Sequence, residues 1–404
     1  MPPILEIYVL WHPGDTQGQG IADSLLEHFR GTPYSGLAGG AVEVYTRSAA
    51  WGPDSDRPRA LPFGEPLPYG LCPSRITAVV PILGVRLARA AADQASGWRG
   101  YLEEVVAAAA EASHVGIFPV CLSGSIDGPL RSLLGSVQAL TSESADNPAV
   151  LCRDLSQQIA QLVNDPFGDR LNVFISHTKR HSPDEAPDRV DDIVGRVRET
   201  LGSTHLRAYF DEADVQPGSN WDDELRANAA SSALLAIRTD LYAGREWCQR
   251  EFLIAKQAGM PIVTLNAVNR AEERGSFVMD HVPSVGYRDH DDATRRQSIE
   301  DALNLLVDGA LRRAIWGIQE VYLRSIGFDW LPLHAPEPAT LIPWLVDNRE
   351  RAVSDGRVLV MHPDPPLGPE EANLVDQLFD IAGVSGTIDV VTPRTFASRG
   401  GREI

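Results

Sequence analysis

Hydrophobic residues along the first part of the chain fall into two alternating patterns. Residues 4–11 (ILEIYVLW) and 76–82 are nearly continuous apolar runs, which predict buried strands. Residues 21–29 instead carry apolar side chains at the spacing of one helix face. Strands that alternate with helices predict a parallel sheet with helices on both faces. The predicted strands are 4–11, 41–45, 76–82 and 115–121, and the predicted helices are 21–29 and 99–112.

The same alternation starts again at residue 171. Residues 172–176 and 261–267 are apolar runs of strand length, whereas residues 298–322 form a long stretch with an apolar stripe at helical spacing. This half of the chain therefore also predicts a parallel α/β fold. Its predicted strands are 172–176, 205–211, 233–239, 261–267 and 284–288, and its predicted helices are 188–201, 222–231, 247–258 and 298–322.

These patterns divide the chain into five parts. A third strand–helix–strand pattern begins at residue 357, and it is too short for a complete α/β domain. Either this segment packs on the other parts or the natural chain continues, and we expect the second. The segment before it holds several prolines and reads as a linker. The expected parts are an α/β domain at 1–145, a connecting helix at 146–170, a second α/β domain at 171–325, a proline-rich linker at 326–356 and the start of a third α/β unit at 357–404.

Charge and cysteine content narrow the function classes. The chain has 36 Lys and Arg against 55 Asp and Glu, a net charge of −19, which argues against a nucleic-acid-binding or anionic-membrane surface. Its four cysteines include no Cys-x-x-Cys pair, and we expect no metal site. We see no signal peptide and no apolar stretch of the roughly 18 residues that span a bilayer, so we expect a cytoplasmic protein.

One short segment carries the best candidate chemistry. Trp247 and Glu251, in the sequence WCQRE, lie four positions apart and share one face of a predicted helix. An aromatic ring beside a carboxylate suits a sugar substrate that develops positive charge. Upstream stand NVFISH at 172–177, Phe-Asp at 210–211 and PGSNW at 217–221.

In this order, these segments resemble the TIR (Toll/interleukin-1 receptor) domain family over residues 171 to about 310. Thr239 and Tyr242 match the family's Ser-x-x-Tyr turn. The resemblance implies a flavodoxin-like parallel sheet, and we interpret residues 1–145 as a second, degenerate TIR-like α/β domain. Two features depart from the family: Arg245 stands where a small serine is common, and the loop at 178–187 is longer and more charged.

The resemblance implies that Glu251 is the catalytic carboxylate of an NAD+ glycohydrolase. The chemistry agrees, because cleavage between nicotinamide and ribose passes through an oxocarbenium-like state that a carboxylate stabilises. Nicotinamide leaves as a neutral molecule, so no general acid and no cofactor are needed, and NAD+ is the substrate. The alternative is that Glu251 is a solvated helix residue paired with Arg250, Arg245 or Lys256.

The resemblance also implies a set of substrate-binding residues at the carboxyl ends of the strands, where open α/β sheets bind ligands. Several have structural alternatives: Trp247 as a core residue, Lys179 as a surface residue, and Asp211 as a turn or capping residue. Cys248 reads as a packing residue and not as a nucleophile. The expected binding residues are Ser176, His177, Thr178, Lys179, Asp211, Gln216, Trp221 and Trp247.

The function expected from the resemblance is a TIR NAD+ glycohydrolase that releases nicotinamide and ADP-ribose, or a cyclic ADP-ribose, as an antiphage defence effector. Self-association of TIR domains would activate it, and residues 1–145 would receive a nucleotide or protein trigger. The glycine-rich loop at 14–20 in that domain reads as a phosphate cradle or, better, as a plain turn. The alternatives are a non-catalytic TIR scaffold and a sensor of nucleotide signals.

Overall fold

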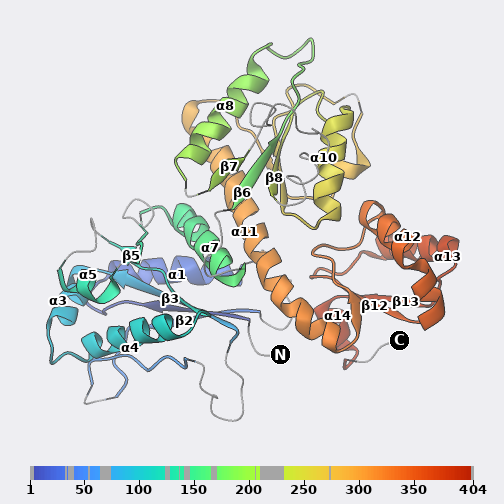
Figure 1. Ribbon diagram of the computed structural model, residues 1–404. Coiled ribbons are helices and arrows are strands. Elements are labelled where there is room, and N and C mark those ends of the chain that lie inside the picture. Colours follow the sequence, from blue (N-terminus) through green and yellow to red (C-terminus); the bar gives the residue numbers. More distant parts are fainter. Residues whose placement is uncertain are drawn as a thin grey trace, which may run out of the picture. The chain divides into compact units, whose positions relative to one another are not determined.

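The described part of the computed structural model contains three parallel sheets and the helices around them (Figure 1). The chain divides into two compact units, residues 1–169 and 170–404. The structure describes residues 4–31, 34, 41–52, 55–63, 74–122, 128–135, 137–140, 146–164, 171–204, 206–209, 232–272 and 274–401.

The first unit contains a parallel sheet in the order β2-β1-β3-β4, with β5 also paired to β3. The expected strand at 115–121 is interrupted at Phe118 and Pro119, and Pro119 has no backbone N–H to donate to a neighbouring strand. All these strands pair in parallel, as expected. Their bounds are β1 Leu5–Leu10, β2 Val42–Arg47, β3 Ile76–Leu83, β4 Val115–Ile117 and β5 Val120–Cys121.

Helices in the first unit form two groups. Helices α3, α4 and α5 pack together over one cluster of apolar side chains, which includes Tyr8 and Leu10 from β1 and Trp98 from α4. Helices α1 and α7 contact each other, and the connecting helix expected at 146–170 is α7 (Figure 1). The bounds are α1 Gln17–Arg30, α3 Val85–Ala92, α4 Gly97–Glu111, α5 Gly128–Leu134 and α7 Pro148–Asn164.

The glycine-rich loop after β1 has a packing explanation. A Cβ on Gly18 would lie 2.5 Å from ring atoms of Trp11, so a side chain there would collide with a buried tryptophan. Asp15 anchors the same loop, because its carboxylate accepts hydrogen bonds of 2.9 Å from the backbone N–H groups of Arg86 and Leu87 at the start of α3. These contacts favour the plain-turn interpretation of this loop.

The second unit begins with a parallel sheet in the order β10-β9-β8-β6-β7. Numbered along this part of the chain, that order is 5-4-3-1-2, and the first unit has the matching order 2-1-3-4. Both are the flavodoxin-like arrangement, which confirms the predicted fold class. The bounds are β6 Asn172–Ser176, β7 Arg207–Tyr209, β8 Ala233–Arg238, β9 Ile262–Asn266 and β10 Ser284–Gly286.

Helices cover this second sheet on both faces. Helices α8 and α11 pack on one face through an apolar cluster that includes Val197 and Leu303. Helix α10 packs through a different cluster, which contains Tyr242, Cys248 and Phe252. The expected helix at 222–231 and the end of the expected strand at 210–211 lie outside the described residues. The bounds are α8 Arg189–Gly202, α10 Glu246–Gln257 and α11 Asp292–Ser325.

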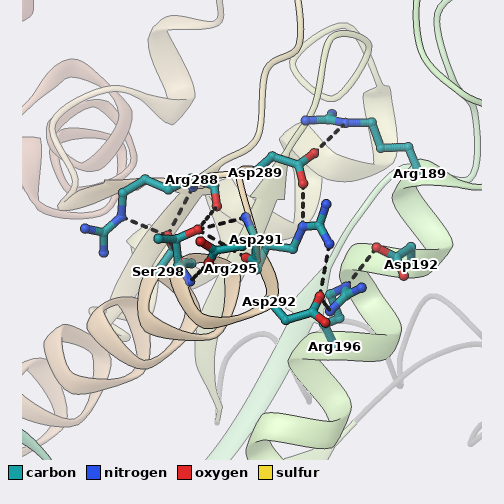
Figure 2. Close-up of polar contacts among 10 residues, drawn as sticks. Arg189, Asp192, Arg196, Arg288, Asp289, Asp291, Asp292, Arg295 and Ser298 are labelled. Atoms are coloured by element: carbon teal, nitrogen blue, oxygen red, sulfur yellow. Dashed lines mark hydrogen bonds and ion pairs between the residues drawn. The ribbon is translucent and has the colours of Figure 1, made fainter.

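Ion pairs connect α8 with the residues around the start of α11 (Figure 2). Arg196 of α8 contacts Asp192 at 2.9 Å and Asp292 at 3.0 Å, and Arg295 contacts Asp289 at 2.6 Å. Asp291 caps α11, because its carboxylate accepts from the backbone N–H of Thr294 at 2.8 Å. These pairs lie at the surface, where solvent screens them, so their main effect is to fix the start of the helix.

The structure corrects one expectation about the C-terminal part. Residues 326–356, expected to be a proline-rich linker, contain β11 and all of α12, and Leu341 and Leu345 are buried under a third sheet. The prolines were misleading because Pro338 occupies the first turn of a helix, where its missing N–H is not needed. The bounds are β11 Phe328–Trp330, α12 Pro338–Asp355, β12 Val358–Met361, α13 Pro369–Ala382, β13 Ile388–Val391 and α14 Pro393–Ser398.

Candidate functional site

Three polar side chains meet at the carboxyl ends of β6 and β8. Ser176 is the last residue of β6, Tyr242 lies in the turn that follows β8, and Glu251 lies on the second turn of α10. Ser176 Oγ lies 2.6 Å from Tyr242 OH, and it donates a short hydrogen bond to Oε2 of Glu251. The loops that follow parallel strands are where α/β sheets of this order bind ligands, so the predicted carboxylate lies at the expected edge.

The three side chains of this cluster differ in how deeply they are buried. Tyr242 is fully buried and Ser176 is 1% exposed, whereas Glu251 is only partly buried. Glu251 is therefore the least buried member of the cluster. Burial, followed by the nearby Cys248 and Glu251, raises the pKa of Tyr242 well above its ordinary value of 10.0, so the phenol keeps its proton at neutral pH.

Cys248 behaves as a packing residue, as the sequence indicated. Its side chain is 4% exposed, and its Sγ lies 3.8 Å from the carbonyl oxygen of His177. Burial is the largest cause that raises the pKa of this thiol, and the Glu251 carboxylate adds to the effect. A thiol that resists ionisation is a poor nucleophile.

Trp247 lies at the surface of α10 and not in the core. Its side chain is 49% exposed, and the guanidinium of Arg250 lies 5.5 Å from the centroid of its ring. The core alternative for Trp247 is therefore wrong. The spacing of four residues places the ring on the same helix face as Glu251, so the two remain available to one ligand.

The start of α10 is held by a hydrogen bond from a side chain to the backbone of the preceding loop. Gln249 donates from Nε2 to the carbonyl oxygen of Ala243 at 2.6 Å, which ties the first turn to the loop after β8. Arg245, the residue that departs from the family pattern, occupies the N-cap position without a side-chain cap. Its Nε is buried and has no hydrogen-bond partner among the described residues.

The loop after β6 brings three of the predicted binding residues to this edge. The Thr178 hydroxyl accepts from the backbone N–H of Arg180 at 3.1 Å, and Thr178 is 3% exposed, so this hydroxyl shapes the loop itself. His177 is partly buried beside α10 through its carbonyl oxygen. Lys179 is exposed, which leaves its ammonium group at the surface of the site.

A buried acidic cluster, which the sequence analysis missed, holds this loop in place. Asp240 accepts from Ser182 Oγ at 3.1 Å and from the backbone N–H of Asn269 at 2.7 Å. Glu185 accepts from the backbone N–H of Ser182 at 2.9 Å and from Arg189 Nη1 at 3.3 Å. These five residues, called the Asp240 network below, connect the loops that follow β6, β8 and β9.

The Asp240 network is almost free of solvent. The Glu185 side chain has no exposed surface and Asp240 is 6% exposed. Arg189 also donates 2.7 Å to the carbonyl oxygen of Ala267, which extends the network to the end of β9. No local pattern predicts this network, because Asp240 stands at an unspecified position of the Thr-x-x-Tyr turn and its partners come from distant loops.

Three predicted site residues, Asp211, Gln216 and Trp221, lie outside the described residues.

Across the described part of the chain, no group of three or more His, Cys, Asp or Glu side chains is arranged to hold a metal ion. Among the described helices, none has both the length and the apolar character that a membrane span needs.

Comparison with known proteins identifies the domain that carries this site. Residues 173–303 match the family model of the TIR domain. A search of curated proteins finds no match to the chain. The chain therefore contains a TIR domain, and Ser176, Tyr242 and Glu251 all lie within it.

Proposed function

We propose that this TIR domain cleaves the bond between nicotinamide and ribose in NAD+. The observation that supports the proposal is the Glu251 carboxylate, which lies at the carboxyl end of β6 and accepts a hydrogen bond from the buried Ser176 hydroxyl. The products would be nicotinamide and ADP-ribose, or a cyclic ADP-ribose. The enzyme would be an NAD+ nucleosidase, a hydrolase that uses NAD+ as substrate and needs no further cofactor.

The reaction needs stabilisation of positive charge more than it needs proton transfer. When the glycosidic bond breaks, its electron pair moves to the pyridine nitrogen and neutralises that ring. Positive charge then develops on the ribose, and a carboxylate at the face of the sugar stabilises it. Water adds to the ribose in hydrolysis and gives up a proton, whereas a nitrogen of the adenine adds in cyclisation.

The residues around Glu251 suggest how the substrate would be held. We propose that the exposed ring of Trp247 covers the nicotinamide riboside and that Lys179 meets the pyrophosphate. Ser176, His177 and Thr178 line the end of β6 beside them. Asp211, Gln216 and Trp221 complete the predicted set.

Control of the activity would come from assembly. We propose that TIR domains of several copies associate, that residues 1–145 receive a nucleotide or protein trigger, and that depletion of NAD+ in the cytoplasm then serves antiviral defence. The matching strand orders of the first unit and the TIR domain support a receptor of the same fold type. A fold likeness is an analogy, so the trigger has to be found by binding experiments.

The direct test is NAD+ consumption by the full chain at high protein concentration. Wild type should consume NAD+, and Glu251→Gln, which keeps the shape of the side chain and removes its charge, should lower kcat by at least about a hundredfold, as loss of a strong electrostatic contact does. Glu246→Gln is the matched control, because Glu246 is an exposed carboxylate on the same helix. Equal activity of wild type and Glu251→Gln would remove Glu251 from the mechanism.

A non-catalytic scaffold is the second candidate. The half-exposed Trp247 favours it, because large exposed aromatic side chains commonly anchor protein interfaces. NAD+ consumption by the assembled protein distinguishes the two candidates, because a scaffold would leave NAD+ intact and an enzyme would not. Binding of a cyclic nucleotide by the full chain would instead favour the nucleotide-sensor alternative.

A further inference from the structure

Tyr242 holds its hydroxyl in an unusual place for a core tyrosine. The side chain is fully buried among the apolar residues that join α10 to the sheet, where a phenylalanine would pack equally well. A buried hydroxyl costs free energy unless it is hydrogen-bonded. The hydroxyl of Tyr242 lies 2.6 Å from Ser176 Oγ.

The chemistry of the three groups fixes the direction of their hydrogen bonds. An ionised carboxylate can only accept, so Ser176 must donate its single proton to Glu251. Ser176 then has no proton left for Tyr242, and Tyr242 must donate to Ser176 Oγ. The result is a directed chain from Tyr242 through Ser176 to Glu251.

We propose that Tyr242 is a positioning residue for the Glu251 carboxylate and that it acts through the Ser176 hydroxyl. Donation from Tyr242 excludes the rotamer in which the Ser176 proton points away from the carboxylate. It also polarises the Ser176 hydroxyl, and hydrogen bonds in such chains strengthen one another. The role for catalysis rests on the proposed function, whereas the coupling between Tyr242 and Glu251 does not.

The kinetic test uses Tyr242→Phe, which removes only the phenolic oxygen. Tyr242→Phe should lower kcat for NAD+ cleavage by about tenfold, as expected for one neutral hydrogen bond. Ser176→Ala should lower kcat by about fiftyfold, because it removes the bond to the charged group. In both variants kcat should fall by a larger factor than KM rises, since both side chains act on the carboxylate that stabilises the transition state.

The decisive variant is the pair Ser176→Ala and Tyr242→Phe together. If Tyr242 acts only through Ser176, the double variant should be no slower than Ser176→Ala alone. If the two losses multiply, Tyr242 acts by another route and the proposal is overturned. Tyr287→Phe is the matched control in the same unit, because the buried Tyr287 hydroxyl has no hydrogen-bond partner among the described residues. It should leave kcat unchanged.

A second measurement separates this proposal from the proposed function. If wild type cleaves no NAD+, the proposed function fails. The coupling between Tyr242 and Glu251 is then measured by thermal unfolding of the same proteins. Tyr242→Phe should then lower Tm more in the wild-type background than in the Glu251→Ala background. In the Glu251→Ala background, the hydrogen bonds from Tyr242 through Ser176 have no charged acceptor at their end. Equal decreases of Tm in both backgrounds would refute the positioning role.

Discussion

Lys256, on the helix that carries Glu251, forms an ion pair of 2.6 Å with Glu337 at the start of α12. The Lys256 side chain is 6% exposed and the Glu337 side chain 15% exposed, so water screens the pair little. Lys256 Nζ also donates 2.7 Å to the carbonyl oxygen of Asp280. Helix α10 is thereby attached to the C-terminal sheet and its helices.

Removal of one partner of this pair should destabilise residues 170–404. Glu337→Gln leaves the Lys256 ammonium group buried without its counter-ion, which costs about 3 kcal/mol for pairs of this kind. Replacement of both by Lys256→Met and Glu337→Leu should recover most of that loss. Denaturant unfolding followed by fluorescence measures the change.

An exposed ion pair provides the control for that experiment. Arg324 and Glu320 lie on α11 with side chains 51% and 37% exposed, so Glu320→Gln should change the free energy of unfolding by less than about 1 kcal/mol. A Glu337→Gln variant as stable as Glu320→Gln would show that the attachment contributes nothing.

Loss of the Asp240 network should weaken substrate binding more than catalysis. Asp240→Ala leaves Ser182 Oγ and the backbone N–H of Asn269 without their acceptor, so the loops after β6 and β9 lose a shared contact. We expect a loss of about 2 kcal/mol in the free energy of unfolding, as for buried polar groups left unsatisfied. We also expect KM for NAD+ to rise several-fold while kcat changes less.

Steady-state kinetics with NAD+ would measure that split. Asp184→Asn is the control, because Asp184 pairs with Arg270 at the rim of the same loops, where both side chains are more than half exposed. Asp240→Ala kinetics that match those of Asp184→Asn would show that the loop after β6 needs no anchor.

Alkaline pH should destabilise the TIR domain through Cys248. Burial raises the pKa of this thiol above its ordinary value of 9.0, so the folded chain keeps the proton at a pH where the unfolded chain releases it. Stability from this group is complete below pH 9 and decreases as the pH rises further, by at most about 1.4 kcal/mol per pH unit. Unfolding measured between pH 7 and 10.5 should show a smaller decrease for Cys248→Ala than for wild type.

Tyr242 should add to the same effect at higher pH. Its pKa is raised well above 10.0 by burial, so the sign of its contribution is the same as that of Cys248 and its onset is later. Identical pH dependences for wild type, Cys248→Ala and Tyr242→Phe would show that neither group stays protonated because of folding.

Replacement of Trp247 tests its proposed contact with the substrate. Trp247→Ala removes a half-exposed ring, so the free energy of unfolding should change by less than about 1 kcal/mol, while KM for NAD+ rises. Trp98→Ala is the stability control, because Trp98 is 1% exposed and its loss should cost about 3–5 kcal/mol. Unchanged KM in Trp247→Ala would assign the ring to protein docking.

Strands with strong apolar patterns were predictable from the sequence, whereas contacts between loops were not. The expected strand at 172–176 agrees with β6 residue for residue, because its central residues Val173, Phe174 and Ile175 are buried in a strand that lies between two others, and such positions are apolar. Helix α3 was missed, since its eight residues include Arg86 and Arg89 and it buries only Leu87 and Ala91. A short helix with so few buried positions has little periodicity to detect.

The candidate site was predictable in outline only. The family resemblance placed Ser176 and Glu251 at one edge of the sheet, and the structure brings them into hydrogen-bond contact. The contact of Tyr242 with Ser176 could not be predicted, because the Tyr242 side chain enters the core from the turn after β8 and meets Ser176 at the end of the neighbouring strand β6. The hydrogen bonds of the Asp240 network depend in the same way on how three distant loops meet, which no local sequence pattern encodes.

Helix α11 runs through 34 residues, about 51 Å at the usual rise per residue. Its first half is part of the TIR core through Leu303, and its second half reaches the C-terminal sheet, where Trp316 Nε1 donates 2.9 Å to the carbonyl oxygen of Leu331. The family match ends at residue 303, inside this helix. A chain cut at that position would sever a continuous buried stripe, so the TIR domain of this protein cannot be excised along the family boundary without exposing its own core.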